Sequence, residues 1–127
     1  MQERHLYEYA VIRLVPKVER EEFFNVGIIL FSKRAKYIKA LYKVDEDKLN
    51  LFSSELDRES LFANLHVFDK ICSGTKEGGP IAALDIPERF RWLTAVRSAS
   101  IQTSRPHPGF SDDLDRTLEI LFRELVL

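Results

Sequence analysis

Two segments near the start of the chain are apolar on both of their alternating faces, and this pattern limits the folds that the chain can adopt. They are Leu6–Val15 (LYEYAVIRLV) and Asn25–Ser32 (NVGIILFS). Successive side chains of a β-strand point to opposite sides, so a strand that is apolar on both sides needs cover on each. The pattern therefore predicts two interior strands of a sheet with other elements packed on both faces.

A third segment, Lys36–Val44, alternates between an apolar face and a face that carries lysines. This pattern indicates an edge strand, because lysines on an edge discourage pairing with other chains. The short Lys33–Ala35 connection favours an antiparallel hairpin, so the three strands are expected to form a meander. Pro16 is expected to end the first strand, and Gly27 indicates a bulge or a close approach by another backbone or a ligand.

Helical periodicity follows the meander. Asp45 is placed to cap a short helix through Leu51, and Asp112 and Asp113 suit the positive first turn of the last helix. The predicted elements are helices at 45–51, from about 57 to Gly74, from Pro87 and from Ser111, a loop at 73–84, and a strand that could form near 99–104. We predict an α+β fold, with a small antiparallel sheet packed with three to four helices, in a single domain of residues 1–127.

The connection between the first two strands carries five charges in six residues, Lys17 to Glu22. One interpretation is a surface turn fixed by an ion pair, either Arg13–Glu21 or Arg20–Glu22. Another is a single helical turn over Glu19–Phe24 that folds Phe23 and Phe24 back over the sheet. The functional hypothesis makes this turn, with Arg13 beneath it, a polar pocket or docking face.

The net charge of −1 combines a basic beginning with an acidic remainder. Residues 1–43 contain nine Lys or Arg against five Asp or Glu, and residues 44–127 contain ten against fifteen. Basic residues near the third strand, with an aromatic beside them, would suit weak, salt-sensitive contact with nucleic acid. The alternative is a soluble edge strand. The residues concerned are Lys33, Arg34, Lys36, Tyr37, Lys39 and Lys43.

The residue types that support metal or nucleophilic chemistry are scattered along the chain. The three histidines, His5, His66 and His107, lie far apart, and the carboxylate runs fall at expected helix starts. We therefore expect no metal and no cofactor. Cys72 is the single cysteine and falls on an apolar helix stripe, which predicts a buried, inert thiol. We expect a soluble cytoplasmic protein with no signal peptide and no membrane contact.

The spacing Y-x-V-I-R-x-V-P at Tyr9–Pro16, followed by R-E-E-F-x-N-V-G-I-I-L-F at Arg20–Phe31, resembles the opening of a bacterial family named domain of unknown function 3037. The aromatic-rich Arg89–Arg97 segment, the Ser104–Gly109 stretch and the final Leu-rich helix are also similar to that family. The resemblance implies no established activity and no catalytic assignment. Members are often encoded beside a HipA-like kinase, which implies that kinase as a partner.

A second polar stretch, Gln102–Asp113, holds Arg105 before Pro106 and His107 between Pro106 and Pro108. It precedes a helix start, where an anion can bind. The alternative is a rigid connector. We predict a non-enzymatic interaction or regulatory module that partners a HipA-like kinase. An uncharacterised enzyme or nucleic-acid-processing factor with an Arg/Glu/His pocket is the alternative, and a homodimer is also open. The candidate pocket or docking face comprises Arg13, Arg20, Glu21, Glu22, Asn25, Arg105 and His107.

Overall fold

The computed structural model of the chain describes residues 4–17, 22–51, 58–95 and 100–127. Its centre is a five-stranded antiparallel sheet in the order β3-β2-β1-β4, with β5 also paired to β1. The strands are β1 (His5–Lys17), β2 (Glu22–Ser32), β3 (Tyr37–Tyr42), β4 (Ile101–Thr103) and β5 (His107–Ser111). The α+β class, the N-terminal meander and the additional strand near 99–104 are thus confirmed.

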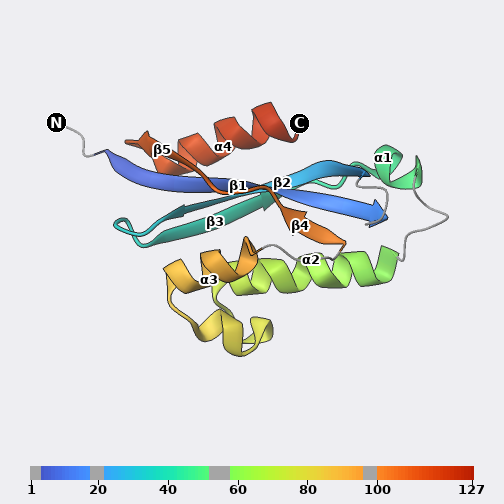
Figure 1. Cartoon of the computed structure of the whole chain (residues 1–127), viewed down its shortest axis with the longest axis horizontal. Helices are drawn as coiled ribbons and strands as arrows, with labels where there is room; N and C mark the ends of the chain where they lie inside the picture. The colour runs from blue at the N-terminus through green and yellow to red at the C-terminus, as the bar shows by residue number, and fades with distance from the viewer. Residues whose placement is uncertain (1–3, 18–21, 52–57, 96–99) are drawn as a thin grey trace.

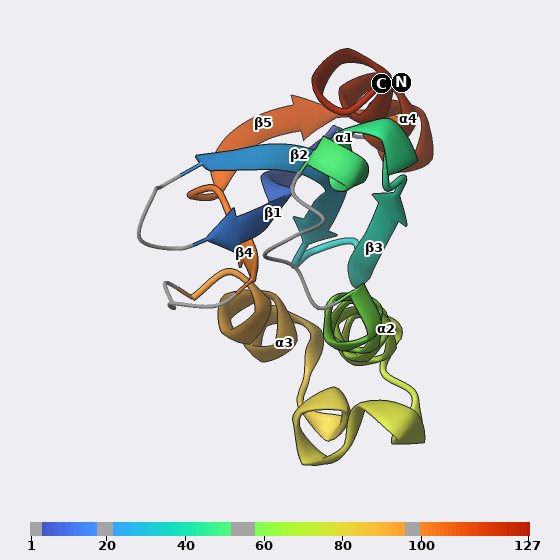
Figure 2. The ribbon, with the colours of Figure 1, turned by 90° about the vertical axis from the view of Figure 1, so that its right-hand side faces the viewer.

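Helices lie on both faces of this sheet, with α4 on one side and α2 and α3 on the other (Figures 1 and 2). The helices are α1 (Glu46–Leu51), α2 (Arg58–Ser73), α3 (Ile86–Leu93) and α4 (Leu114–Leu125), with the short 3₁₀ helices η2 (Lys76–Gly78) and η3 (Pro80–Ala83). Within the described ranges, each helix is too short or too polar to cross a membrane.

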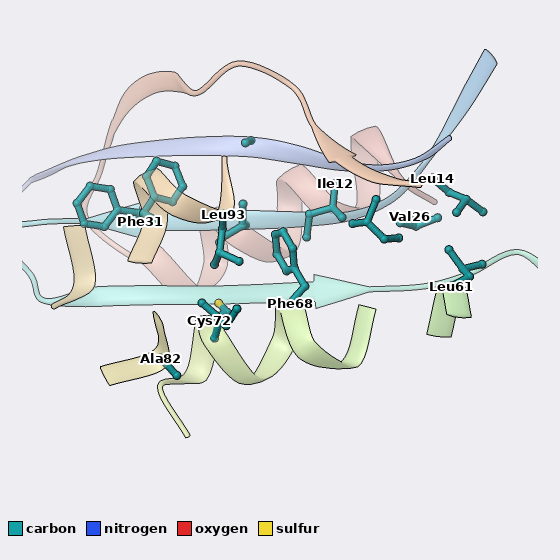
Figure 3. Close-up of a cluster of buried hydrophobic side chains, with 14 of the residues drawn as sticks. Ile12, Leu14, Val26, Phe31, Leu61, Phe68, Cys72, Ala82 and Leu93 are labelled. Carbon is teal, nitrogen blue, oxygen red and sulfur yellow. The ribbon is translucent and has the colours of Figure 1, made fainter. Parts of the chain in front are cut away.

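The two faces of β1 enter two separate hydrophobic clusters. Ala10, Ile12 and Leu14 pack toward α2 and α3, in the cluster that Figure 3 shows in close-up. Val11 points to the opposite side and packs with Ile28 and with side chains of α4. Each fully buried aliphatic side chain contributes about 1.5–3 kcal/mol. The strand that is apolar on both faces is therefore an interior strand, as its sequence predicts.

Gly27 lies at a bulge and beside a neighbouring strand, which confirms both parts of the interpretation of this residue. Ile12 pairs with Gly27 and Arg13 pairs with Asn25, so Val26 is an extra residue in β2. A Cβ atom on Gly27 would lie 2.5 Å from the carbonyl oxygen of Leu41 in β3. Only a residue without a side chain leaves β3 at hydrogen-bonding distance here.

The stretch expected to be a rigid connector contains a fifth strand, so the connector prediction is wrong for His107–Ser111. This strand pairs with the first half of β1 although Pro108 lies within it. Among the described strands β5 has a single neighbour. A proline is tolerated on such an edge because proline has no N–H to donate, and its nitrogen can face away from the partner strand.

Four other boundaries differ from the expected ones. Phe23 and Phe24 continue β2 and do not form a helical turn. The α4 cap is Asp113, whose carboxylate accepts from the Arg116 N–H, while Ser111 ends β5. β1 passes through Pro16, where its pairing with β2 is irregular, and the predicted loop at 73–84 contains η2 and η3. Strand pairing decides the extent of β1 and β2, and the Asp113 cap decides the start of α4.

Candidate functional site

Arg13 and Asn25 lie directly opposite each other on β1 and β2. The Arg13 guanidinium carbon lies 4.3 Å from the centre of the Phe23 ring, within the range of a cation–π contact. The Asn25 amide nitrogen donates to the Leu125 carbonyl oxygen, 2.9 Å away, at the end of α4. Both polar side chains therefore make contacts that fix β2 and α4 in place.

The structure places the second polar stretch on the other side of β1. Gln102 in β4 is the direct partner of Arg13, and His107 in β5 is the direct partner of Tyr9. The His107 and Tyr9 rings have centroids 5.2 Å apart. Tyr9 precedes Arg13 by four residues, which is about 13 Å along a strand. Arg105 lies exposed in the connection between β4 and β5.

The predicted pocket is thus divided along β1. Arg13 and Asn25 meet at one point, while His107 lies further along the strand. Among the described residues, no hydrogen bond or ion pair joins Arg13, Asn25, Arg105 and His107. Arg20 and Glu21 lie outside the described residues, and of Glu22 only the backbone is described. A shared polar pocket or docking face of these residues stays a prediction.

A different surface is hollowed on the sheet face that α2 and α3 cover only in part. Leu6 and Phe110 are direct partners on β1 and β5, and 54% and 61% of their surfaces are exposed. Phe31 and Pro108 complete an apolar floor across β5, β1 and β2. We name this surface the Leu6–Phe110 groove, and its volume is about 730 Å³. Volumes of this size are typical of binding sites.

The groove begins where the covered part of the same face ends. The Phe31 ring is 8% exposed and stacks on Phe90 of α3, with centroids 4.7 Å apart. Beyond this pair, the start of β1 and β5 extend past α3 (Figure 1). Ser32 donates from its hydroxyl to the Leu6 carbonyl oxygen, 2.8 Å away, and so holds the start of β1 beside β2. The floor therefore rests on paired strands.

Three cations lie around this floor, and one carboxylate lies within it. Arg4, Lys33 and Arg34 line the groove, and Glu8 on β1 lies between its direct partners Phe31 and Pro108. The Arg4 guanidinium carbon lies 5.6 Å from the centre of the Phe110 ring. An exposed apolar patch with a polar rim is typical of a surface that binds another molecule.

Of the groove residues, Lys33 and Arg34 are candidates from the sequence only as part of the basic edge, and the apolar Leu6 and Phe110 are not among the candidates. Leu6 was assigned to a covered strand, because its neighbours on both faces are apolar. The signal that could have found it lies in His107–Ser111, where Phe110 stands between glycine and serine in a stretch with little other apolar content. Once this stretch pairs with β1, Phe110 has to lie beside Leu6.

The basic edge that suggested nucleic-acid contact lies against acidic residues. The Tyr37 hydroxyl donates to a carboxylate oxygen of Asp115, 2.7 Å away, and the Lys39 ammonium lies 3.7 Å from the same carboxylate. Burial, and then this hydrogen bond to Asp115, raise the pKa of Tyr37. The N-terminus of α4 therefore engages part of the charge that nucleic acid would need.

Cys72 lies in the covered core, where burial is the main cause that raises the pKa of its thiol to about 12. Asp69 raises this pKa further and Arg89 lowers it. A thiol that keeps its proton at neutral pH is a poor nucleophile. In the part of the chain that the structure describes, no three His, Cys, Asp or Glu side chains are grouped so that they could hold a metal ion.

Comparison with known proteins gives one match. The model of a family described as "Protein of unknown function (DUF3037)" matches residues 9–126. No curated protein and no solved structure shows significant similarity to the chain.

Proposed function

The chain belongs to the DUF3037 family of proteins of unknown function, and from this premise we propose that it is an interaction module that docks a partner protein on the Leu6–Phe110 groove. The observation that carries the proposal is the exposure of two large apolar side chains directly opposite each other on neighbouring strands. Leu6 and Phe110 are each more than half exposed, although Leu14, on the same face of β1, is fully buried.

The chemistry of the floor favours binding over catalysis. Leucine, phenylalanine and proline side chains supply most of its area, and the one carboxylate that lines the groove is Glu8. Removing such an area from water contributes about 25 cal/mol per Å², which is the main driving force of protein association. Large apolar anchors near the centre of an interface also contribute most of its binding energy.

A HipA-like kinase is the partner that the family resemblance implies. A small domain that docks on a kinase by an apolar face would act as its regulator or adaptor, without chemistry of its own. The groove supplies such a face on rigid strands, because Leu6 and Phe110 are fixed by the β1–β5 pairing. Rigid anchors lose little conformational entropy on binding.

Co-purification tests this proposal. The chain is co-expressed with a HipA-like kinase, and complex formation is then measured with purified proteins at micromolar concentration. We expect a stable complex that the double variant L6S/F110S abolishes. The matched control is Phe62→Ser, which removes another exposed aromatic side chain, on α2, away from the groove.

Two outcomes would contradict the proposal. One is the absence of a complex at micromolar concentration. The other is a complex that L6S/F110S weakens no more than Phe62→Ser does. Circular dichroism of each variant before the assay ensures that the comparison is made between folded proteins.

A further inference from the structure

The Leu6–Phe110 groove is lined by more positive than negative charge, with the three cations Arg4, Lys33 and Arg34 against the single carboxylate of Glu8 in the floor. We infer that the occupant of the groove is an acidic amphipathic helix of the partner protein, with an apolar stripe on the floor and carboxylates toward the rim. This inference rests on the proposed docking function and adds the chemistry of the docked segment.

Two of the three cations, Lys33 and Arg34, are available to a partner, whereas Arg4 already lies over the Phe110 ring. Among the described residues, no carboxylate forms an ion pair with Lys33 or Arg34. Other cations of the molecule are engaged: Lys39 lies near Asp115, and Arg58 near Glu46. An acidic ligand would therefore find free charges at the groove without having to displace an internal partner.

The positions of Lys33 and Arg34 are set by a tight turn between β2 and β3. The Lys36 N–H donates to the Lys33 carbonyl oxygen, 3.2 Å away, and Lys36 has a φ of 54°. This turn holds the two cations beside Phe31, at the end of β2. An apolar floor beside a charge excludes water when it is covered, which strengthens the attraction to a carboxylate.

The width of the floor suits a helix. It spans three strands, β5, β1 and β2, and neighbouring strands lie about 4.8 Å apart, so the floor is about 10 Å wide. An α-helix with its side chains is about 10–12 Å in diameter. The same sheet face is already covered further along by α2 and α3 (Figure 2). A docked helix would extend this layer over the uncovered end of the sheet.

Three synthetic peptides test the inference. They share one Leu/Phe stripe with helical spacing and differ only in the polar face, which is built from Glu, from Gln or from Lys. Binding of the labelled peptides to the full chain is measured by fluorescence anisotropy at low and at high salt. We expect the Glu peptide to bind about tenfold more tightly than the Gln peptide, and the Lys peptide to bind most weakly. The difference should shrink as salt is added.

Charge variants then locate the effect. K33E/R34E is expected to reverse the order of the Glu and Lys peptides. K43E/K76E makes the same change in net charge at exposed lysines away from the groove lining, and it should leave the order unchanged. The variant L6S/F110S should weaken all three peptides together, because it removes the floor that they share.

The outcomes separate this inference from the proposed function. If the three peptides bind within about twofold of one another and L6S/F110S still abolishes binding, the acidic helix is wrong and the docking groove stands. If K43E/K76E changes the order as much as K33E/R34E does, the inference also fails. Displacement of the Glu peptide by dodecanoate at a lower concentration than by unlabelled peptide would assign the groove to a fatty acid and overturn it. The absence of binding by every peptide at millimolar concentration would overturn it as well.

Discussion

Leu6 and Leu14 lie on the same face of the same strand, yet one is 54% exposed and the other is fully buried. Leu14 has a partner on each side, Phe24 in β2 and Ile101 in β4. Leu6 is paired with Phe110 in β5, and toward β2 its carbonyl oxygen accepts from the Ser32 hydroxyl. Neighbouring strands therefore flank both leucines, and the exposure of Leu6 has its main cause above the sheet.

The difference between the two leucines comes from the helices on this face. Leu14 is buried in one cluster with Leu61 of α2 (Figure 3), whereas α3 reaches only as far as Phe31 and leaves Leu6 exposed. We name the part of β1 around Leu14 the covered half and the part around Leu6 the open half. Their contrast shows that the same pattern builds a core where a helix lies above it and a docking surface where none does.

Replacing each of the two leucines by alanine should show the contrast between the covered half and the open half most clearly. Leu14→Ala is expected to lower the free energy of unfolding by about 2–5 kcal/mol, because it leaves a cavity in a packed core. Leu6→Ala should lower it by less than about 0.5 kcal/mol, as is usual on a surface. Urea unfolding followed by circular dichroism measures both values. Equal losses at the two positions would contradict an open half.

Two glycines provide a second comparison between the halves. A Cβ atom on Gly27 or on Gly109 would meet another atom at 2.5 Å, but the atom is the Leu41 carbonyl oxygen in the first case and the Tyr7 ring in the second. Gly27→Ala is expected to lower the free energy of unfolding by about 3 kcal/mol, because the backbone of β3 has to shift.

For Gly109→Ala we expect a loss of less than about 1 kcal/mol, because the Tyr7 side chain can rotate away. The same urea titration measures this variant. A larger loss of unfolding free energy at Gly109 than at Gly27 would mean that the open half is the more tightly packed of the two, which would contradict the contrast between the halves.

Ser104 joins the two halves, at the point where β4 gives way to β5. Its buried hydroxyl oxygen accepts from the Val11 N–H at 2.8 Å. Ser104→Ala should lower the free energy of unfolding by about 2 kcal/mol, because it leaves a buried N–H without a partner. The control is Ser73→Ala, which removes an exposed hydroxyl that bonds only within α2, and it should change stability by less than about 0.5 kcal/mol. Similar results for the two serines would show that Ser104 does not link the halves.

Cys72 beneath the covered half gives an effect that is confined to alkaline pH and is therefore absent at neutral pH. Its pKa is raised from 9.0 to about 12, mainly by burial, so between these values the unfolded chain loses a proton that the folded chain keeps. The stability that this group supplies is therefore complete below pH 9 and decreases as the pH rises, by about 1 kcal/mol per pH unit.

Cys72→Ala should remove this component of the alkaline slope. Burial also raises the pKa of Tyr42 and of Tyr37, so the wild-type protein keeps losing stability for other reasons, and the measured quantity is the difference between the two proteins. Identical slopes of unfolding free energy against pH would show that the thiol is not buried as the structure has it.

The sequence predicts the covered half better than the open half, and the reason is physical. Alternation along Leu6–Val15 shows which side chains share a face, and this is enough to predict an interior strand. It does not show where a distant helix ends, so Leu6 and Leu14 look equivalent. The groove depends on that end point and on β5, which the prolines around His107 concealed.

For a related reason, the sequence predicts a capped start of the last helix but does not show which residue is the cap. Ser111, Asp112 and Asp113 all suit a helix start, and the choice among them depends on the pairing of Ser111 with His5 in β1. Once Ser111 is held in β5, Asp113 is the residue placed to accept from the Arg116 N–H. The Asn25 side chain likewise bonds to the Leu125 carbonyl oxygen, a hundred residues away in the sequence, and no local pattern around Asn25 indicates this contact.

Hydrogen–deuterium exchange of the chain, alone and with a saturating HipA-like kinase, shows whether a partner binds at the open half of β1. We expect slower exchange in the complex at β5 and at the β2–β3 turn, which border the groove, and no change at Ala10–Val15, which is already covered. Slower exchange confined to α4 or to the outer edge of β3 would contradict this expectation, because the partner would then bind away from the open half of β1.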